Sequence, residues 1–178
     1  NNLIIQGAAL KAKTNKSKKN KIFCSSIEHK CVLDSVNFCG KLGFDIEMIP
    51  VNKEGIIDIN DLSKKINDET LLISVMAVNN ETGLRTNFEE ISDLCKKYDV
   101  FFHSDVAQAL HSEKFDLSQS NIDAVSISGH KIHGPKGVGC LIFRDNPSNF
   151  IEPIMYGGLQ EQNLRSGTSP VFLAVGLS

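Results

Sequence analysis

The sequence lacks three features that would each point to a particular class of protein. It has no C-x-x-C pair among its five cysteines, no apolar run of membrane-spanning length and no large excess of charge. Because the cysteine count is odd and no zinc-type spacing occurs, we expect free, reduced intracellular thiols rather than a zinc site. A membrane span needs roughly 18 consecutive apolar residues. The net charge of −2 gives no reason to expect nucleic acid or an anionic membrane as a partner. The composition is that of an ordinary globular protein.

Lysines are concentrated in one segment, 11–21, which holds six of them. One interpretation is a basic patch for an anionic partner. The other is a solvated loop between a helix and a strand, because Asn15, Ser17 and Asn20 interrupt the lysines as a loop would. We favour the loop.

Short apolar runs alternate with helical patterns along almost the whole chain. Strands are predicted at Lys21–Ser25, Phe44–Pro50, Leu71–Val78, Val100–His103, Asp123–Ser128 and Gly139–Phe143. Helices are predicted at Leu3–Leu10, at Lys30–Leu42 with Gly43 as its C-terminal cap, at Asp61–Ile66, from an Asn87 N-cap to about Tyr98, and at Val171–Leu177. Strands separated by helices imply right-handed crossovers. The fold class is therefore α/β, a three-layer α/β/α domain with a mainly parallel sheet.

Polar residues follow four of the predicted strands directly. They are Glu28 and His29; Asn79, Asn80 and Glu81; Asp105 and Gln108; and His130 and Lys131. In open α/β sheets, ligands bind outside the carboxyl ends of the strands, so these side chains should meet at one edge. A structural protein has no need for that arrangement.

Lys131 is the residue on which we place the most weight. It follows a strand, in the context Ser126 to Lys131, and precedes a segment with glycines at 134, 137 and 139. Those glycines allow close backbone approach or positive φ. A turn leading into the next strand is the plainer interpretation, and the two are compatible. The segment does not have the spacing of a Walker loop.

Asp105 ends a strand of apolar and aromatic residues, where a carboxylate is costly unless it is paired. A protonated heterocycle nitrogen is one such partner, and enzymes of pyridoxal phosphate (PLP) use an Asp in this way. The alternative is that Asp105 caps a helix over Val106–Leu110.

Several polar residues are weak indicators singly but form a coherent set. They are His29, Asn80, Gln108, Ser128 and His130. Each could instead serve a turn, a helix start or a backbone group. Together they offer a flat ring for stacking, amides for a phenolic oxygen and donors for a phosphate, as a phosphorylated aromatic cofactor requires.

Successive segments resemble landmarks of the cysteine desulfurases, which are fold-type-I, class V aminotransferase-like PLP enzymes. These segments are Glu28-His29-Lys30, Val78 to Gly83, His103 to Gln108, Ser126 to Gly139 and Arg165-Ser166-Gly167-Thr168. The match runs in order over essentially the whole chain. The Asn-Asn-Glu-x-Gly and Arg-Ser-Gly-Thr forms resemble the iron–sulfur cluster assembly branch most.

The resemblance implies catalytic roles for two residues. Lys131 would carry PLP as a Schiff base and move the substrate Cα proton, while His29 would stack on the pyridine ring and assist proton transfers. Asp105 would hold the pyridine nitrogen.

The resemblance also implies further cofactor contacts. Asn80 and Gln108 would lie near the phenolic oxygen, and Ser128 and His130 would bind the phosphate. Thr168 would reach the phosphate of the neighbouring subunit in a homodimer.

One segment departs from the family pattern. Leu159 and Gln162 stand where the family usually has a glycine and a basic residue, so the backbone path and the charge near the dimer interface would differ. Arg165 would lie close to that interface.

The resemblance implies a transferase that converts L-cysteine into L-alanine and an enzyme-bound persulfide. That sulfur would serve iron–sulfur cluster assembly and tRNA thiolation, through a scaffold or another sulfur-acceptor protein, in a bacterial cytoplasm or a mitochondrial matrix. The family's nucleophilic cysteine follows the Arg-Ser-Gly-Thr segment, where none of the five cysteines stands.

We therefore expect residues 1–178 to be the central part of a PLP-binding large domain, inactive alone, with an N-terminal segment and a C-terminal small domain outside it. The alternatives are a selenocysteine lyase, an aminotransferase or a non-catalytic relative of the fold.

Overall fold

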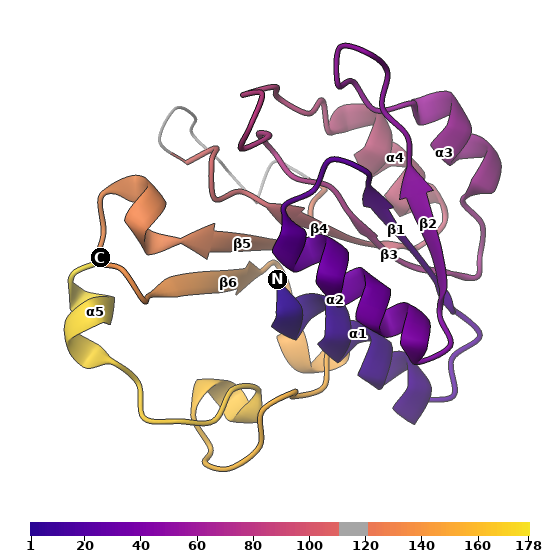
Figure 1. The fold of residues 1–178 in the computed structure, drawn as a ribbon. Coiled ribbons are helices and arrows are strands. Elements are labelled where there is room, and N and C mark those ends of the chain that lie inside the picture. Colours follow the sequence, from indigo (N-terminus) through magenta and orange to yellow (C-terminus); the bar gives the residue numbers. More distant parts are fainter. Residues whose placement is uncertain (111–120) are drawn as a thin grey trace.

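The computed structural model describes residues 1–110 and 121–178. Its strands are β1 Lys21–Ser25, β2 Asp45–Ile49, β3 Thr70–Ser74, β4 Phe101–Asp105, β5 Ala124–Ser128 and β6 Gly139–Phe143. They form one sheet in the order β2-β1-β3-β4-β5-β6. β1 to β5 run parallel and β6 runs antiparallel to β5 (Figure 1). The prediction of a mainly parallel sheet is confirmed.

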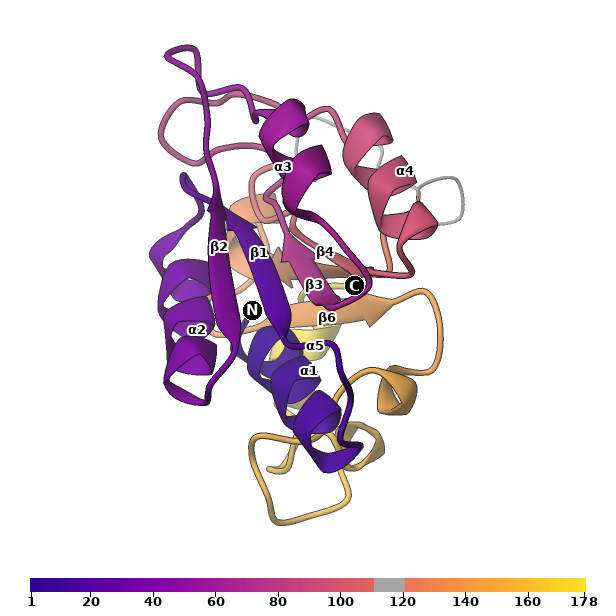
Figure 2. The ribbon, with the colours of Figure 1, turned by 90° about the vertical axis from the view of Figure 1, so that its right-hand side faces the viewer.

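The helices cover both faces of this sheet. They are α1 Asn2–Thr14, α2 Lys30–Lys41, α3 Ile59–Lys65, α4 Glu89–Lys97 and α5 Val171–Val175. α1 and α2 lie side by side on one face, and α3 and α4 cover the other (Figures 1 and 2). The predicted three-layer arrangement is confirmed. Within the described ranges no helix has the length and apolar character needed to cross a membrane.

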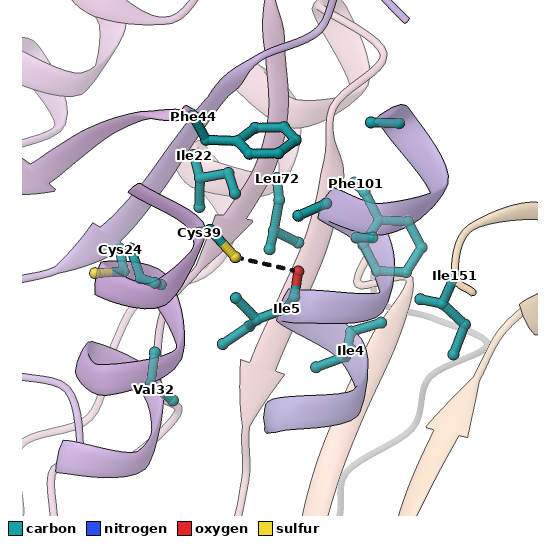
Figure 3. Close-up of a cluster of buried hydrophobic side chains, with 14 of the residues drawn as sticks. Ile4, Ile5, Ile22, Cys24, Val32, Cys39, Phe44, Leu72, Phe101 and Ile151 are labelled. Atoms are coloured by element: carbon teal, nitrogen blue, oxygen red, sulfur yellow. Dashed lines mark hydrogen bonds between the residues drawn. The ribbon is translucent and has the colours of Figure 1, made fainter. Parts of the chain in front are cut away.

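A cluster of buried apolar side chains lies beneath α1 and α2. Ile5 of α1 packs with Val32 and Cys39 of α2 over Ile22 and Leu72 of the sheet, and all five are fully buried (Figure 3). Burying an aliphatic side chain of this size stabilises the fold by about 1.5–3 kcal/mol. This packing holds the first turns of both helices close to the sheet.

The second core lies between the sheet and the helices α3 and α4. Phe23, Ile73 and Phe102 pack there against Leu62 and Ile91. These strand residues follow directly on those of the first core, because successive side chains of a strand point to opposite faces. The central strands β1, β3 and β4 therefore bury apolar residues on both faces, as a parallel sheet covered on both sides requires.

The prediction that 11–21 is a loop is wrong for its first residues. α1 continues to Thr14 because its buried face extends to Ala12. Tertiary contacts also hold this turn, since Lys11 Nζ lies 2.9 Å from Glu152 Oε1 and Lys13 Nζ lies 5.5 Å from the centre of the Phe44 ring. A composition rule for loops takes no account of such long-range partners.

Strand β3 ends at Ser74, four residues before the predicted end at Val78. Its neighbour β1 leaves the sheet after Ser25, so the ladder on that side stops. On the other side the chain stays paired with β4, where the Val75 N–H donates to the His103 carbonyl at 3.1 Å.

Three predicted helix starts differ in detail, and the first is that of α3, which begins at Ile59, two residues before the predicted Asp61. The N-cap of α4 is Phe88, one residue after the predicted Asn87, but the Asn87 side chain still accepts the Glu89 N–H at 3.2 Å. The stretch 106–110 forms turns rather than a helix, so Asp105 is not a helix cap.

The segment after β6 leaves the sheet and returns to the short 3₁₀ helix η1, Gly129–Ile132 (Figure 1). It contains the 3₁₀ helices η2, Pro147–Asn149, and η3, Glu161–Asn163, and then α5. Large apolar side chains are exposed along it, among them Tyr156, Leu159 and Phe172, at 78%, 83% and 94%. All three residues of η3 have positive φ, including Gln162.

Candidate active site

A cavity of about 600 Å³ opens at the carboxyl ends of β3, β4 and β5. Its walls come from the starts of α1 and α2, from the loops after β3 and β4, and from β5, η1 and β6. The polar lining residues predicted from the sequence are His29, Asn80, Asp105, Gln108, Ser128, His130 and Lys131. Every predicted cofactor contact except Thr168 therefore lies in one cavity.

Thr168 is exposed and lies outside this cavity, as does Arg165. Both belong to the segment after β6, whose apolar side chains also face solvent. The structure of one chain therefore does not bring Thr168 to the other predicted residues.

Lys131 lies on η1, directly after β5. Two backbone hydrogen bonds of 2.9 Å hold the turn. The Gly129 N–H donates to the Val138 carbonyl, and the Gly134 N–H donates to the Gly129 carbonyl. A Cβ on Gly134 would lie 2.9 Å from that Gly129 oxygen, so a larger residue would displace the turn. The glycines therefore allow the tight turn that places Lys131 at the cavity wall.

Asp105 is the last residue of β4 and is 6% exposed. Its Oδ2 accepts a hydrogen bond from Asn1 Nδ2 at 2.7 Å, and its Oδ1 accepts the Ala107 N–H at 3.0 Å. These two bonds orient the carboxylate and offset part of the cost of burying it. It retains acceptor capacity for a cationic partner in the cavity.

His29 is the N-cap of α2, and its Nδ1 accepts the Cys31 N–H at 3.2 Å. An acceptor nitrogen carries no proton, so the ring is fixed with its Nε2 as the donor in the neutral form. The Cys31 thiol also lies 2.9 Å from Nδ1. Helix capping therefore sets the position and tautomer of this imidazole.

A buried chain of hydrogen bonds lies under the cavity. His103 Nδ1 lies 2.8 Å from Ser74 Oγ, and its Nε2 lies 2.9 Å from Ser126 Oγ, so the chain links β3, β4 and β5. His103 is fully buried, and desolvation lowers its pKa to about 3. Ser126 lines the cavity, where Ser128 Oγ and His130 Nδ1 also lie 3.1 Å apart.

The family model for aminotransferase class-V matches residues 1–178, the whole chain. The chain belongs to the class V aminotransferase family.

Relatives within this class V family are cysteine desulfurases. The chain is 48% identical over 177 residues to the mitochondrial cysteine desulfurase of Drosophila melanogaster, covering 99% of this chain and 38% of that protein. It is 47% identical to cysteine desulfurase IscS of Rickettsia felis, covering 99% and 42%. The chain thus spans about two fifths of the length of these relatives.

A solved structure, SspA in complex with cysteine, has the same fold. It is 38% identical to this chain with a TM-score of 0.86, covering 96% of this chain and 52% of that one.

Sequence reasoning missed several residues of this class V cavity. Asn1 contacts Asp105, and Cys31 and Cys140 also line the walls. Asn1 and Cys31 come from helix starts, and Cys140 lies exposed on the antiparallel strand β6. The rule that sites follow the carboxyl ends of parallel strands does not find such positions.

Proposed function

We propose that residues 1–178 form the central part of the PLP-binding large domain of a cysteine desulfurase. An N-terminal segment and a C-terminal small domain would lie outside this part. The observation that carries the proposal is the single cavity that collects Lys131, Asp105 and His29 from three different elements. The identity of about 47% to named cysteine desulfurases supports this choice within the class V family.

The residues of the cavity fit PLP. Its volume of about 600 Å³ lies in the range of small-ligand sites. The Lys131 amine would hold the cofactor covalently, the oriented carboxylate of Asp105 would face the pyridinium nitrogen, and the His29 ring would stack on the heterocycle. PLP supplies an electron sink for charge that develops at the substrate Cα.

The polar rim would position the rest of the cofactor. Asn80 and Gln108 would donate from their amides to the phenolic oxygen. Ser128 and His130, which already contact each other, would donate to the phosphate. Asn80 and Gln108 lie on the loops after β3 and β4, Ser128 ends β5, and His130 lies on η1.

The proposed reaction removes sulfur from L-cysteine. Lys131 would take the Cα proton and return a proton on the way to L-alanine. A cysteine thiolate outside residues 1–178 would attack the substrate sulfur, so the substrate C–S bond breaks and an enzyme persulfide forms. The sulfur would pass to an iron–sulfur scaffold or another acceptor protein, including tRNA thiolation partners, in a bacterial cytoplasm or mitochondrial matrix.

A second copy of the chain would complete the site. The predicted phosphate contact Thr168 lies outside the cavity of its own chain, in the same segment after β6 as exposed apolar residues such as Tyr156 and Leu159. Large exposed apolar groups support an interaction surface. We propose that this segment contributes Thr168 and Arg165 to the neighbouring subunit of a homodimer.

Product analysis of the full-length protein tests the proposed reaction. L-Cysteine should give alanine and sulfide in equal amounts, with a reductant present to release the persulfide. Preference for selenocysteine would indicate a lyase, and transamination of 2-oxo acids alone would indicate an aminotransferase. A colourless protein that ignores added PLP would identify a non-catalytic relative.

A further inference from the structure

The loops that carry His29 and Asn80 begin where β1 and β3 part. β1 pairs with β3 as far as Cys24 opposite Ser74. Beyond that point, the Ala77 N–H donates to the Asp105 carbonyl at 2.9 Å, on the β4 side. Because N–H groups alternate along an extended chain, the N–H of Met76 faces the other side, where β1 has already ended.

Glu28 supplies the missing acceptor for that N–H. Its Oε1 accepts the Met76 N–H at 2.7 Å, and the residue is 5% exposed. Burial, with a smaller contribution from Asp105, raises the pKa of Glu28 to about 8. A neutral carboxylic acid therefore takes the place of a strand carbonyl at this point of the sheet.

Asn79 makes a second hydrogen bond between the two loops, in which the side chain comes from the loop after β3 and the backbone group from the loop after β1. Its Nδ2 donates to the Ile27 carbonyl at 2.8 Å, so the loop after β3 is tied back to the loop after β1. Its Oδ1 accepts the N–H groups of Glu81 and Thr82, at 3.0 and 2.9 Å. The residue is 6% exposed, and its side chain determines the path of the loop on both sides of Asn80.

Each of these two residues immediately precedes a residue of the cavity, since Glu28 precedes His29 and Asn79 precedes Asn80. We propose that Glu28 and Asn79 form a reciprocal clasp between the two loops and act as positioning residues. The clasp fixes the separation of the imidazole and the amide that contact PLP. This inference rests on the proposed function of the cavity as a PLP site.

A clasp predicts that cofactor binding suffers more than folding does. Breaking one bond leaves both cores intact, because neither Glu28 nor Asn79 belongs to the apolar clusters. Without the hydrogen bond the two loops can separate. Cofactor binding then includes the free-energy cost of ordering these loops, which the clasp removes in the wild type. The bound cofactor should also lose part of its fixed orientation.

The test uses the full-length protein, stripped of cofactor and titrated with PLP. The dissociation constant, the visible circular dichroism of the bound cofactor and the melting temperature of the apo protein are measured. Glu28→Ala removes the acceptor for Met76, whereas Glu28→Gln keeps an oxygen there without a titratable group. Asn79→Asp replaces the amide that donates to the Ile27 carbonyl and to Met76 Sδ with a carboxyl group, and it keeps the acceptor for Glu81 and Thr82.

Asn52 provides a matched control. Its Oδ1 also accepts two backbone N–H groups, from Glu54 and Ile56 at 3.0 and 2.9 Å, in an exposed loop that does not line the cavity. Asn52→Asp therefore makes the same chemical change in the same kind of turn, away from the clasp.

We expect Glu28→Ala and Asn79→Asp each to weaken PLP binding about tenfold, the effect of one lost buried hydrogen bond. Their visible dichroism should fall while the apo melting temperature changes little. Glu28→Gln and Asn52→Asp should bind like the wild type. If Glu28→Ala does not fold, the comparison of PLP affinity and dichroism between Asn79→Asp and Asn52→Asp tests the clasp by itself.

Unchanged PLP affinity and dichroism in Asn79→Asp would overturn the clasp while leaving the proposed function intact. So would an apo melting temperature that falls in proportion to the affinity, because that result indicates a general folding role. A wild-type protein that binds no PLP would overturn the proposed function, and the clasp with it.

Discussion

The carboxyl-end loops of the sheet and the segment after β6 are held in contrasting ways. Around the cavity, Asp105 and Asn79 make short bonds within the chain and are almost fully buried. After β6, Leu159 and Phe172 are almost fully exposed, and three consecutive residues of η3 have positive φ. The first region draws its geometry from this chain alone. The second exposes large apolar side chains, which is what we expect of the dimer surface proposed above.

The largest effect should come from the central residue of the first region. In the full-length enzyme, Lys131→Ala should lower the rate of alanine formation by on the order of 10³-fold, because both cofactor attachment and proton transfer are lost. Lys136, five residues along the same loop, does not line the cavity. Lys136→Ala should retain most activity, and equal losses in the two variants would contradict the assignment.

Paired truncations should separate the two regions by stability. Ile73 is fully buried in β3, so Ile73→Ala should lower the free energy of unfolding by about 2–5 kcal/mol. Phe172 is 94% exposed, so Phe172→Ala should change the stability of the monomer by less than about 0.5 kcal/mol. Urea titration at low protein concentration measures both.

For self-association we expect the opposite order, with Phe172→Ala weakening the dimer more than Ile73→Ala does. Sedimentation at rising concentration should show weaker dimers for Phe172→Ala and unchanged dimers for folded Ile73→Ala. A strong loss of monomer stability in Phe172→Ala would contradict the distinction between the regions.

A smaller expected effect is the change of stability with pH that the buried carboxyl group of Glu28 causes. The folded pKa of Glu28, about 8, lies above its ordinary value of 4.5, so the folded state holds the proton more tightly. Its contribution to stability is complete below the ordinary pKa and is lost as the pH rises toward about 8. Glu28→Gln should flatten this decline, measured as the urea midpoint at several pH values.

His103 gives the opposite dependence and serves as the internal control. Its folded pKa of about 3 lies below the ordinary 6.5, so its contribution is complete above that value and is lost as the pH falls. The acid limb should therefore be the same in the wild type and in Glu28→Gln. An alkaline limb that is also unchanged would contradict the burial of a neutral Glu28.

Much of the fold could be predicted because its strands are short and the central strands β1, β3 and β4 bury apolar residues on both faces. β1 and β6 were predicted to the residue at both ends, and the other strands to within one or two residues, apart from the carboxyl end of β3. The C-terminal end of α1 could not be predicted, because Lys11 and Lys13 contact residues far along the chain. Local composition carries no information on such partners.

The candidate site divides in the same way. Asp105, Asn80 and Lys131 could be predicted to meet because parallel strands bring their carboxyl ends to one edge. The positions of Asn1 and Cys31 could not be predicted. These residues line the cavity from the starts of α1 and α2, the helices that cover one face of the sheet. The place of Thr168 stays a prediction, since one chain does not contain the neighbour it would serve.

Reduction of the full-length protein with borohydride, followed by peptide mapping, tests the central claim most directly. Borohydride fixes PLP to the lysine that holds it, so the mass of the modified peptide identifies the site. The account predicts a pyridoxyl group on Lys131 and none on Lys136 or on the lysines of segment 11–21. A label on another lysine, or no label in a protein saturated with PLP, would contradict it.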